Sequence, residues 1–394
     1  MVSATLGACF VGSSGPKISV RGDRWAAATL PRKVHESGRR GWAALLTTHF
    51  DDALANALKI AATSPSSHNC QPWALVRLGP ESLLLASDRD RELRTLPAHH
   101  AEMRVSCGLF WRLLHLALAA QGWVVETESM PELSELPPTW TPLRVARFHF
   151  TGAPDGPLDD LRSIAGRRHT NRGPYRDRSV PSTVLGELGM RGAVAEPPVL
   201  IRHLTIERDR NLFAAFVARH GGKEFAHRAA WREAYSFIRR TETEARIRGD
   251  GYAFTTLFGP LSAGSLLLRR VVLAPAAMSA LRLTGFPRLL SGKLAAIVRR
   301  SPVIVSMSLP DSADPEWDLV TAGGVLLDYW LRATAFGLVL HPVSVVIQHE
   351  DLRRELQAGF DLPGRVFFIA RLGYPAERFP SAPRRPAAAA LRPL

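Results

Sequence analysis

The spacing of apolar residues along the chain predicts a mixture of helices and strands. Residues 54–62 read as a helix, and residues 74–78 form a short apolar run typical of a strand. A hairpin partner is expected at 82–86, and later strands at 144–150 and 365–372. Helices and strands interleaved in this way indicate an α+β fold.

Two longer helices are apolar almost all round, which fits a buried central position. One begins near Gly108 and reaches Gly122, and the other begins near Gly323 and reaches Gly337, so both glycine pairs have the same separation. Each helix ends at a glycine suited to a left-handed cap, and a β-rich run follows it. This weak internal repeat predicts two related halves; the alternative is chance similarity between two ordinary α+β halves.

The helix-to-strand junction at 64–73 has the sequence SPSSHNCQPW. Its serines and asparagine are short donors and acceptors that can bind a polar ligand while the flanking elements hold the backbone still. The alternative is a helix exit in which these side chains satisfy loose backbone groups.

A second polar stretch, RRHTNRGPY at 167–175, gathers three arginines, a histidine and a threonine. Guanidinium groups bind phosphate with two parallel hydrogen bonds, and a threonine hydroxyl adds a compact donor. The alternative is a solvated basic face, which is common in a chain this rich in arginine.

Together, the two stretches resemble signature segments of the FMN-dependent nitroreductase superfamily. Residues 64–73 look like its [AS]PSSxNxQPW segment, and residues 168–172 look like its R-[RH]-[ST]-x-[RK] segment. The first segment occurs only in the first half of the chain and the second only in the second half. From about residue 50 onward the chain therefore resembles the Acg-like branch, an intramolecular pseudo-dimer of two diverged halves. The resemblance implies a central, mainly antiparallel sheet and buried helices in each half, and one complete flavin site per chain.

This resemblance also implies which residues hold the FMN phosphate. Arg168 and Arg172 are the first candidates, because they match the family's flavin-binding segment. Arg384 and Arg385 resemble the C-terminal basic pair that also reaches the phosphate. The alternative for this tail is a solvated end rich in Pro, Ala and Arg.

On the ring side, the resemblance implies that Ser66, Ser67 and Asn69 donate to the isoalloxazine and ribityl groups. His169 and Thr170 would contact the ring edge and the ribityl or phosphate region. The loop 341–344, which ends at Ser344, corresponds to the family's backbone donor to flavin N5, although the family's Glu-Gly is absent there. No catalytic acid or base is assigned, and no metal-ligand spacing is present.

The composition gives little support to other classes of protein, such as nucleic-acid-binding, disulfide-rich or membrane-spanning proteins. The chain has 394 residues, is 46% hydrophobic and carries a formal charge of +14, but its arginines are dispersed and no nucleic-acid-binding motif is present. Three widely spaced cysteines exclude a disulfide framework and favour a reducing cytoplasm. The sequence has no uninterrupted stretch of about eighteen apolar residues, so we expect no membrane span.

The domain boundaries follow from the repeat. We expect a flexible N-terminal extension at 1–45 and nitroreductase-like halves at 46–154 and 155–394. An insertion at about 220–300 reads as packed helices or a lid, and its apolar and basic tract at 266–300 also allows peripheral membrane contact. Pro275 and the Gly-Phe-Pro at 285–287 break that tract into short pieces, which favours packing or a lid. The chain is expected to be a monomer or a homodimer.

The resemblance implies an oxidoreductase that transfers two electrons, in ping-pong fashion, from NAD(P)H through FMN to an electrophilic or conjugated small molecule. Nitroaromatics, quinones, enones and biosynthetic intermediates form that class. Two flavin-dependent alternatives remain: an FMN-binding or sequestering protein with little turnover, and a biosynthetic dehydrogenase that passes electrons to oxygen. A flavin-free interaction protein that keeps the fold is a third.

Overall fold

The computed structural model describes residues 39–131 and 136–392. Residues 44–394 form one compact unit. The predicted extension at 1–45 lies almost wholly outside the described residues. The first described helix is α1 (Arg39–Ala61).

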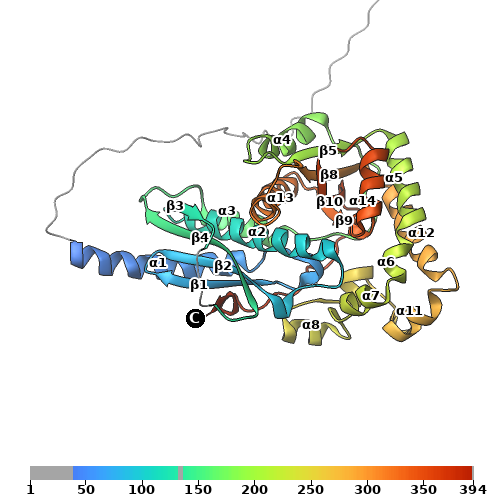
Figure 1. Cartoon of the computed structure of the whole chain (residues 1–394), viewed down its shortest axis with the longest axis horizontal. Helices are drawn as coiled ribbons and strands as arrows, with labels where there is room; N and C mark the ends of the chain where they lie inside the picture. Colours follow the sequence, from blue (N-terminus) through green and yellow to red (C-terminus); the bar gives the residue numbers. More distant parts are fainter. Residues whose placement is uncertain (1–38, 132–135, 393–394) are drawn as a thin grey trace, which may run out of the picture. The chain divides into compact units, whose positions relative to one another are not determined.

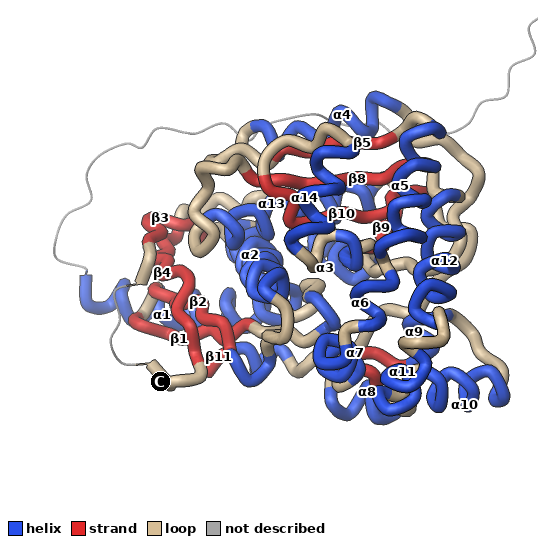
Figure 2. Tube along the Cα trace, turned by 45° about the vertical axis from the view of Figure 1, so that its right-hand side comes forward, coloured by secondary structure: helices blue, strands red, loops and turns tan. Residues whose placement is uncertain are grey.

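One sheet has the strand order β11-β1-β2-β4-β3; β1 to β4 are labelled in Figure 1 and β11 in Figure 2. It is antiparallel except that β11, from the C-terminal end of the described chain, pairs in parallel with β1. The strands predicted at 74–78, 82–86 and 144–150 fall in β1, β2 and β4 and are confirmed. Their bounds are β1 Trp73–Gly79, β2 Ser82–Asp88, β3 Trp123–Ser129, β4 Trp140–Phe150 and β11 Leu391–Arg392.

A second sheet has the order β5-β8-β10-β9 and is antiparallel throughout. Every residue of β8 is buried, as expected for an apolar central strand. The strand predicted at 365–372 is β10 and is confirmed. The bounds are β5 Leu200–Leu204, β8 Val303–Leu309, β9 Val339–Pro342 and β10 Arg365–Gly373.

Two buried helices, α2 (Pro97–Ala119) and α13 (Asp318–Ala335), pack on each other between the sheets (Figure 2). They are the two apolar helices of the sequence repeat, and their burial is confirmed. The helices cross at the paired glycines, where a Cβ on Gly323 would lie 2.9 Å from the Cα of Gly108. Gly122 and Gly337 follow the helices with φ of 83° and 74°, the left-handed conformation that glycine adopts freely.

The two sheets share one connectivity. In the first, α2 leads into edge strand β3 and then β4, which lies between β3 and β2. In the second, α13 leads into edge strand β9 and then β10, which lies between β9 and β8. The sequence repeat therefore corresponds to a repeated order of strands and helices, and the α+β class is confirmed.

The remaining helices surround these layers. They are α3 Leu158–Arg167, α4 Ser182–Ala193, α5 Glu207–His220, α6 Gly222–Ala226, α7 Arg228–Tyr235, α8 Glu242–Arg248, α9 Phe254–Phe258, α10 Ala263–Val272, α11 Pro275–Leu281, α12 Phe286–Arg299 and α14 Glu350–Gly359. Short 3₁₀ turns are η2 Ser67–Asn69, η3 Arg89–Arg91, η4 Ser344–Val346 and η5 Ala387–Ala390, and a small parallel pair is β6 Ile238–Arg239 with β7 Tyr252–Ala253.

The segment at 220–300 is helical, and part of it packs on the protein. α12 lies against α5, where Phe213 and Val217 meet Ala295 and Val298 in a small apolar core. α11 begins at Pro275 and α12 begins after Gly285, so the tract is broken at both predicted places. Among the described residues, no single helix is long and apolar enough to cross a membrane, although α10 and α11 together pass that test with a 69° bend between them.

His115 on α2 predicts a pH-dependent stability. Its ring lies 4.4 Å from that of Trp111 and 5.3 Å from that of Phe148, and burial, then the Arg112 charge, lower its pKa from 6.5 to about 3. Between these values the unfolded chain binds a proton that the folded chain does not, so the free energy of unfolding falls as the pH falls. In urea titrations, His115→Leu should lose less stability than the wild type between about pH 7 and pH 5, by at most about 1.4 kcal/mol per pH unit. Parallel pH profiles for both proteins would contradict this.

Candidate functional site

The backbone of the 64–73 run is strained where α1 gives way to β1. His68, Asn69 and Gln71 have φ of 48°, 53° and 53°, a left-handed conformation that costs non-glycine residues about 1 kcal/mol or more each. Among the described residues, the only other non-glycine residue with positive φ is Asp361. Strained residues persist only where surrounding contacts hold them, and they cluster at active sites and ligand-binding sites. Their concentration in one short run is therefore typical of a functional site.

Side-chain hydrogen bonds hold this conformation and bring distant segments to it. The amide N–H of Gln71 donates to Ser66 Oγ at 2.9 Å, and Gln71 Nε2 donates to the carbonyl of Gly249 at 2.7 Å. Asn69 Nδ2 donates to the carbonyls of Gly251 and Pro383, both at 2.8 Å. The predicted run therefore contacts both the insertion and the C-terminal tail, and the asparagine amide is engaged within the protein.

Two arginines predicted to bind phosphate lie beside the run. Arg168 and Arg384 both donate to the carbonyl of Thr63, at 3.1 and 3.2 Å, and Arg168 lies 5.0 Å from the ring centre of Trp330. Burial, then the neighbouring Arg384 charge, lower the pKa of Arg168 to about 9, and burial lowers that of Arg384 to about 10. Within the described ranges neither guanidinium has a carboxylate partner. This leaves positive charge that an anion would neutralise.

The other two predicted arginines lie next to the same segments. Arg385 donates to the carbonyl of Gln71 at 2.9 Å, and burial, then the Arg91 charge, lower its pKa to about 10. The guanidinium of Arg172 lies 5.1 Å from the ring centre of Tyr252, and burial lowers its pKa. The structure thus brings the tail arginines to the 64–73 run, although they are more than 300 residues apart in sequence.

His169 lines a cavity of about 350 Å³ next to α3. Its Nδ1 lies 2.9 Å from the carbonyl oxygen of Arg167, while its Nε2 has no partner among the described residues. Arg167 and Arg378 line the same cavity and make it basic. Thr170 forms a bridge with Leu340 of β9, and that strand leads through the loop 341–344 into η4, which begins at Ser344. Thr170 is therefore placed near the loop that holds Ser344.

Ser67 contacts two residues that the sequence analysis did not assign to the site, Glu102 and Ser106. Its hydroxyl donates to the carboxylate of Glu102 on α2, and its amide donates to Ser106 Oγ at 3.1 Å. Gln348, which follows η4 in the second half, donates to the other oxygen of Glu102 at 3.2 Å. Glu102 thus joins the first segment to the second half of the chain, and no local pattern identified it.

Tyr252, which lies in the insertion at about 220–300, was also missed. Its ring lies 6.2 Å from that of His68 and under the Arg172 guanidinium. It therefore lies between a residue of the 64–73 run and a residue of the 167–175 stretch. Burial, then the His99 charge, lower the pKa of His68 to about 4, which keeps its imidazole neutral at pH 7. The insertion therefore covers the 64–73 run through the Gly249–Tyr252 stretch.

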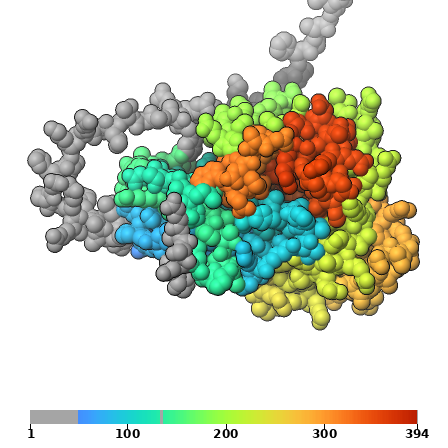
Figure 3. Space-filling model, viewed as in Figure 1, coloured from blue at the N-terminus to red at the C-terminus, as the bar shows by residue number. Residues whose placement is uncertain are grey.

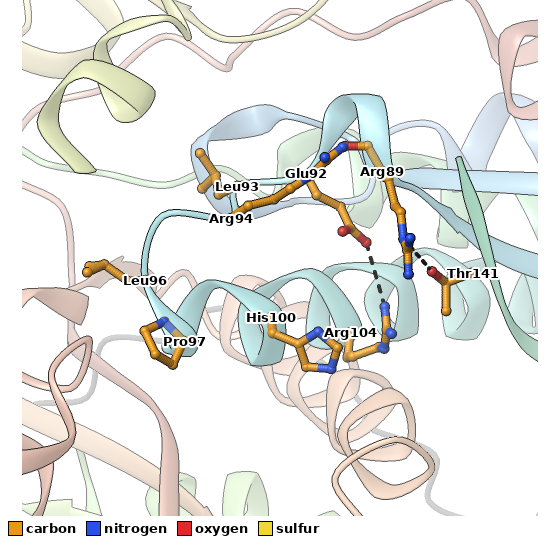
Figure 4. A pocket seen from close by; sticks show the side chains of 9 residues that line it. All are labelled: Arg89, Glu92, Leu93, Arg94, Leu96, Pro97, His100, Arg104 and Thr141. Carbon is orange, nitrogen blue, oxygen red and sulfur yellow. Dashed lines mark hydrogen bonds and ion pairs between the residues drawn. The ribbon is translucent and has the colours of Figure 1, made fainter. Parts of the chain in front are cut away.

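The other large cavity, about 310 Å³, is a separate feature (Figure 4). It is lined by Arg89, Glu92, Leu93, Arg94, Leu96, Pro97, His100, Arg104 and Thr141, none of which was predicted as a site residue. Arg104 lies 3.6 Å from Glu92 and 3.0 Å from Glu316, so its charge is already neutralised. Arg168 and Arg384 at Thr63, by contrast, have no carboxylate partner within the described ranges.

Comparison with known proteins identifies the family. The chain is 31% identical over 351 residues to PigM of Serratia sp. strain ATCC 39006, named a probable NAD(P)H nitroreductase; the match covers 85% of this chain and 92% of PigM. Rv3131 of Mycobacterium tuberculosis strain H37Rv, also provisionally named an NAD(P)H nitroreductase, is 26% identical over 358 residues, which are 87% of this chain and 92% of Rv3131.

A solved structure of the FMN-dependent nitroreductase NfnB from Mycobacterium smegmatis is 15% identical, and the alignment covers 57% of this chain and 96% of NfnB with a TM-score of 0.34. No family model matches the chain. The relatives define a flavin-dependent oxidoreductase. The chain belongs to the nitroreductase superfamily, and its relatives extend to Acg-like proteins.

Proposed function

We propose that the chain binds one FMN and uses it to pass two electrons from NAD(P)H to an electrophilic or conjugated small molecule. The observation that carries this proposal is the pair of arginines at Thr63, of which Arg168 is buried and Arg384 half-buried. A buried cation without a counter-ion is costly, and a phosphate dianion between Arg168 and Arg384 would remove that cost through charge-assisted hydrogen bonds.

The residues around the arginines suit the rest of the cofactor. Buried nitrogens of His68, His169, His341 and Arg384 have no partner among the described residues, so they can meet the many acceptors of a flavin nucleotide. When bound, FMN would supply the hydride chemistry. The strained run would fix its position, and the neutral His68 would add a polar group without a second charge.

The repeated connectivity supports the fused-dimer organisation. We propose that residues 46–154 and 155–394 are two diverged nitroreductase-like halves, with α2 and α13 at their junction. The arginines come from the second half and the strained run from the first, so a single composite site is built within one chain. This organisation requires no second copy to complete the site.

The sequestering alternative is favoured by one observation. The stretch Gly249–Tyr252 is hydrogen-bonded to Asn69 and Gln71, so the insertion covers the run in this structure. If that cover is permanent, FMN would be held with little access for NAD(P)H or substrate. If it opens, it would act as a lid that excludes water during turnover.

The visible absorption spectrum of the purified protein, followed by anaerobic titration with NADH and NADPH, distinguishes these functions. The proposal expects an oxidised flavin spectrum at about one FMN per chain, bleached by a nicotinamide donor and restored by a quinone or nitroaromatic. A yellow protein that neither donor bleaches would favour sequestration. A colourless protein that takes up no added FMN would overturn both functions.

A further inference from the structure

Helix α10 exposes an apolar face where a surface helix usually exposes a polar one. Its solvent-facing positions are Ala263, Gly264, Leu267, Leu268 and Val271, which follow the spacing of one helical face. Leu267 and Leu268 are each 63% exposed and Val271 is 59% exposed. The tube view shows α10 at the outer edge of the insertion (Figure 2).

The charged residues of α10 point the other way. The guanidinium of Arg269 lies 4.4 Å from the ring centre of Phe258, and Arg270 donates to the carbonyl of Arg240. Both arginines are half-buried, so they are less exposed than the leucines and valine of the outer face. No residue of the helix is fully buried. An amphipathic helix in water turns its apolar stripe toward the protein, so this orientation indicates that the outer face meets an apolar phase.

The surrounding charge identifies that phase. Residues 251–310 contain seven Lys or Arg residues and no Asp or Glu. Arg282 and Arg288 are exposed beside Leu283 and Leu289, which are 81% and 53% exposed. Arginines interleaved with exposed leucines match an anionic lipid surface, where the side chains enter the acyl boundary and the cations meet phosphate headgroups. The space-filling view shows this segment at the surface of the molecule (Figure 3).

We propose that α10 and the α11–α12 turn form a peripheral docking surface for anionic phospholipid bilayers. The pair α10 and α11 is bent by 69°, which suits a segment lying in the interface rather than crossing it. A second copy of the chain is a poorer occupant, because pairing two such surfaces would bring their cations together and residues 251–310 supply no carboxylate to neutralise them. The proposal is independent of FMN binding.

The test is co-sedimentation of the full chain with vesicles of phosphatidylcholine alone or mixed with phosphatidylglycerol. We expect binding to the anionic vesicles only, weakened by salt, and at least about tenfold weaker for the variant Leu267→Ser/Leu268→Ser/Val271→Ser. Arg282→Gln/Arg288→Gln should also weaken it. The matched control is Met190→Ser/Val194→Ser/Ile206→Ser, which removes three apolar side chains of similar exposure (56%, 72% and 64%) elsewhere and should bind like the wild type.

Two results would overturn the proposal. One is equal binding of the wild type and the α10 variant to anionic vesicles. The other is a lipid-free dimer, seen by sedimentation velocity, that the α10 variant alone dissociates, because the surface would then be an interface between copies. Since the substituted side chains are exposed, circular dichroism should show the same fold in every variant.

Discussion

Replacing Arg168 with methionine should weaken FMN binding and, at the same time, raise the melting temperature of the cofactor-free protein. In the absence of a phosphate, the buried guanidinium keeps one hydrogen bond to Thr63, and no carboxylate within the described ranges neutralises it. Removing an uncompensated buried charge while keeping an unbranched side chain against Trp330 should therefore stabilise the fold.

The loss of FMN affinity follows from the same charge. Hydrogen bonds to charged groups contribute about 1.5–3 kcal/mol, so one lost guanidinium should raise the Kd by roughly 10- to 100-fold. Flavin absorbance after gel filtration and thermal melts with and without added FMN measure the two effects. A higher melting temperature together with weaker FMN binding is the diagnostic result, because damage to the fold alone would lower both.

Arg94→Met provides the matched control. Unlike Arg168, this arginine has a side chain that is 56% exposed, and it lines the cavity of Figure 4 rather than the site. Its FMN content should equal that of the wild type, and its free energy of unfolding should change by no more than about 0.5 kcal/mol. If Arg168→Met instead keeps its FMN and melts lower than the wild type, the phosphate assignment is wrong.

The sequence predicted the α+β class and the central helices because its strongest signals are local. The helices that became α2 and α13 are apolar on every side, and this pattern alone places them in the core. Their glycines were recognised by equal spacing, and all four have a structural role. Gly108 and Gly323 meet at the helix crossing, and Gly122 and Gly337 follow the helix ends. Local periodicity therefore identified the elements, and the repeat predicted which of them correspond.

The site was only partly predictable because its contacts are long-range. Asn69 bonds to Pro383, 314 residues away, and no spacing rule joins those positions. The left-handed conformations of His68 and Gln71 occur at positions that carry no glycine signal, and Gln71 is held by a hydrogen bond to the distant Gly249. Tyr252 belongs to an insertion whose sequence has no motif. The residues that cover the site are therefore visible only once the chain is folded.

Gly323→Ala should be among the most destabilising small substitutions in the chain, whereas Gly324→Ala, one residue on, should be neutral or stabilising. A Cβ on Gly323 would overlap the carbonyl oxygen of Val105 and lie 2.9 Å from the Cα of Gly108, and backbone atoms cannot move aside cheaply. The nearest atom to a Cβ on Gly324 is Arg112 Cβ, at 3.4 Å. We expect a loss of about 3 kcal/mol for Gly323→Ala from overpacking and a gain of up to about 1 kcal/mol for Gly324→Ala from helix propensity.

The same crossing predicts how Gly108 and Gly323 combine. Because each glycine lies against the other helix, Gly108→Ala should destabilise about as much as Gly323→Ala. Once one methyl group has moved the helices apart, the second should cost less, so the double variant should lose less free energy of unfolding than the two single losses together. Urea unfolding of the four proteins measures this coupling. Fully additive losses would mean that the two glycines act at independent places, and the close junction between α2 and α13 would then not hold in solution.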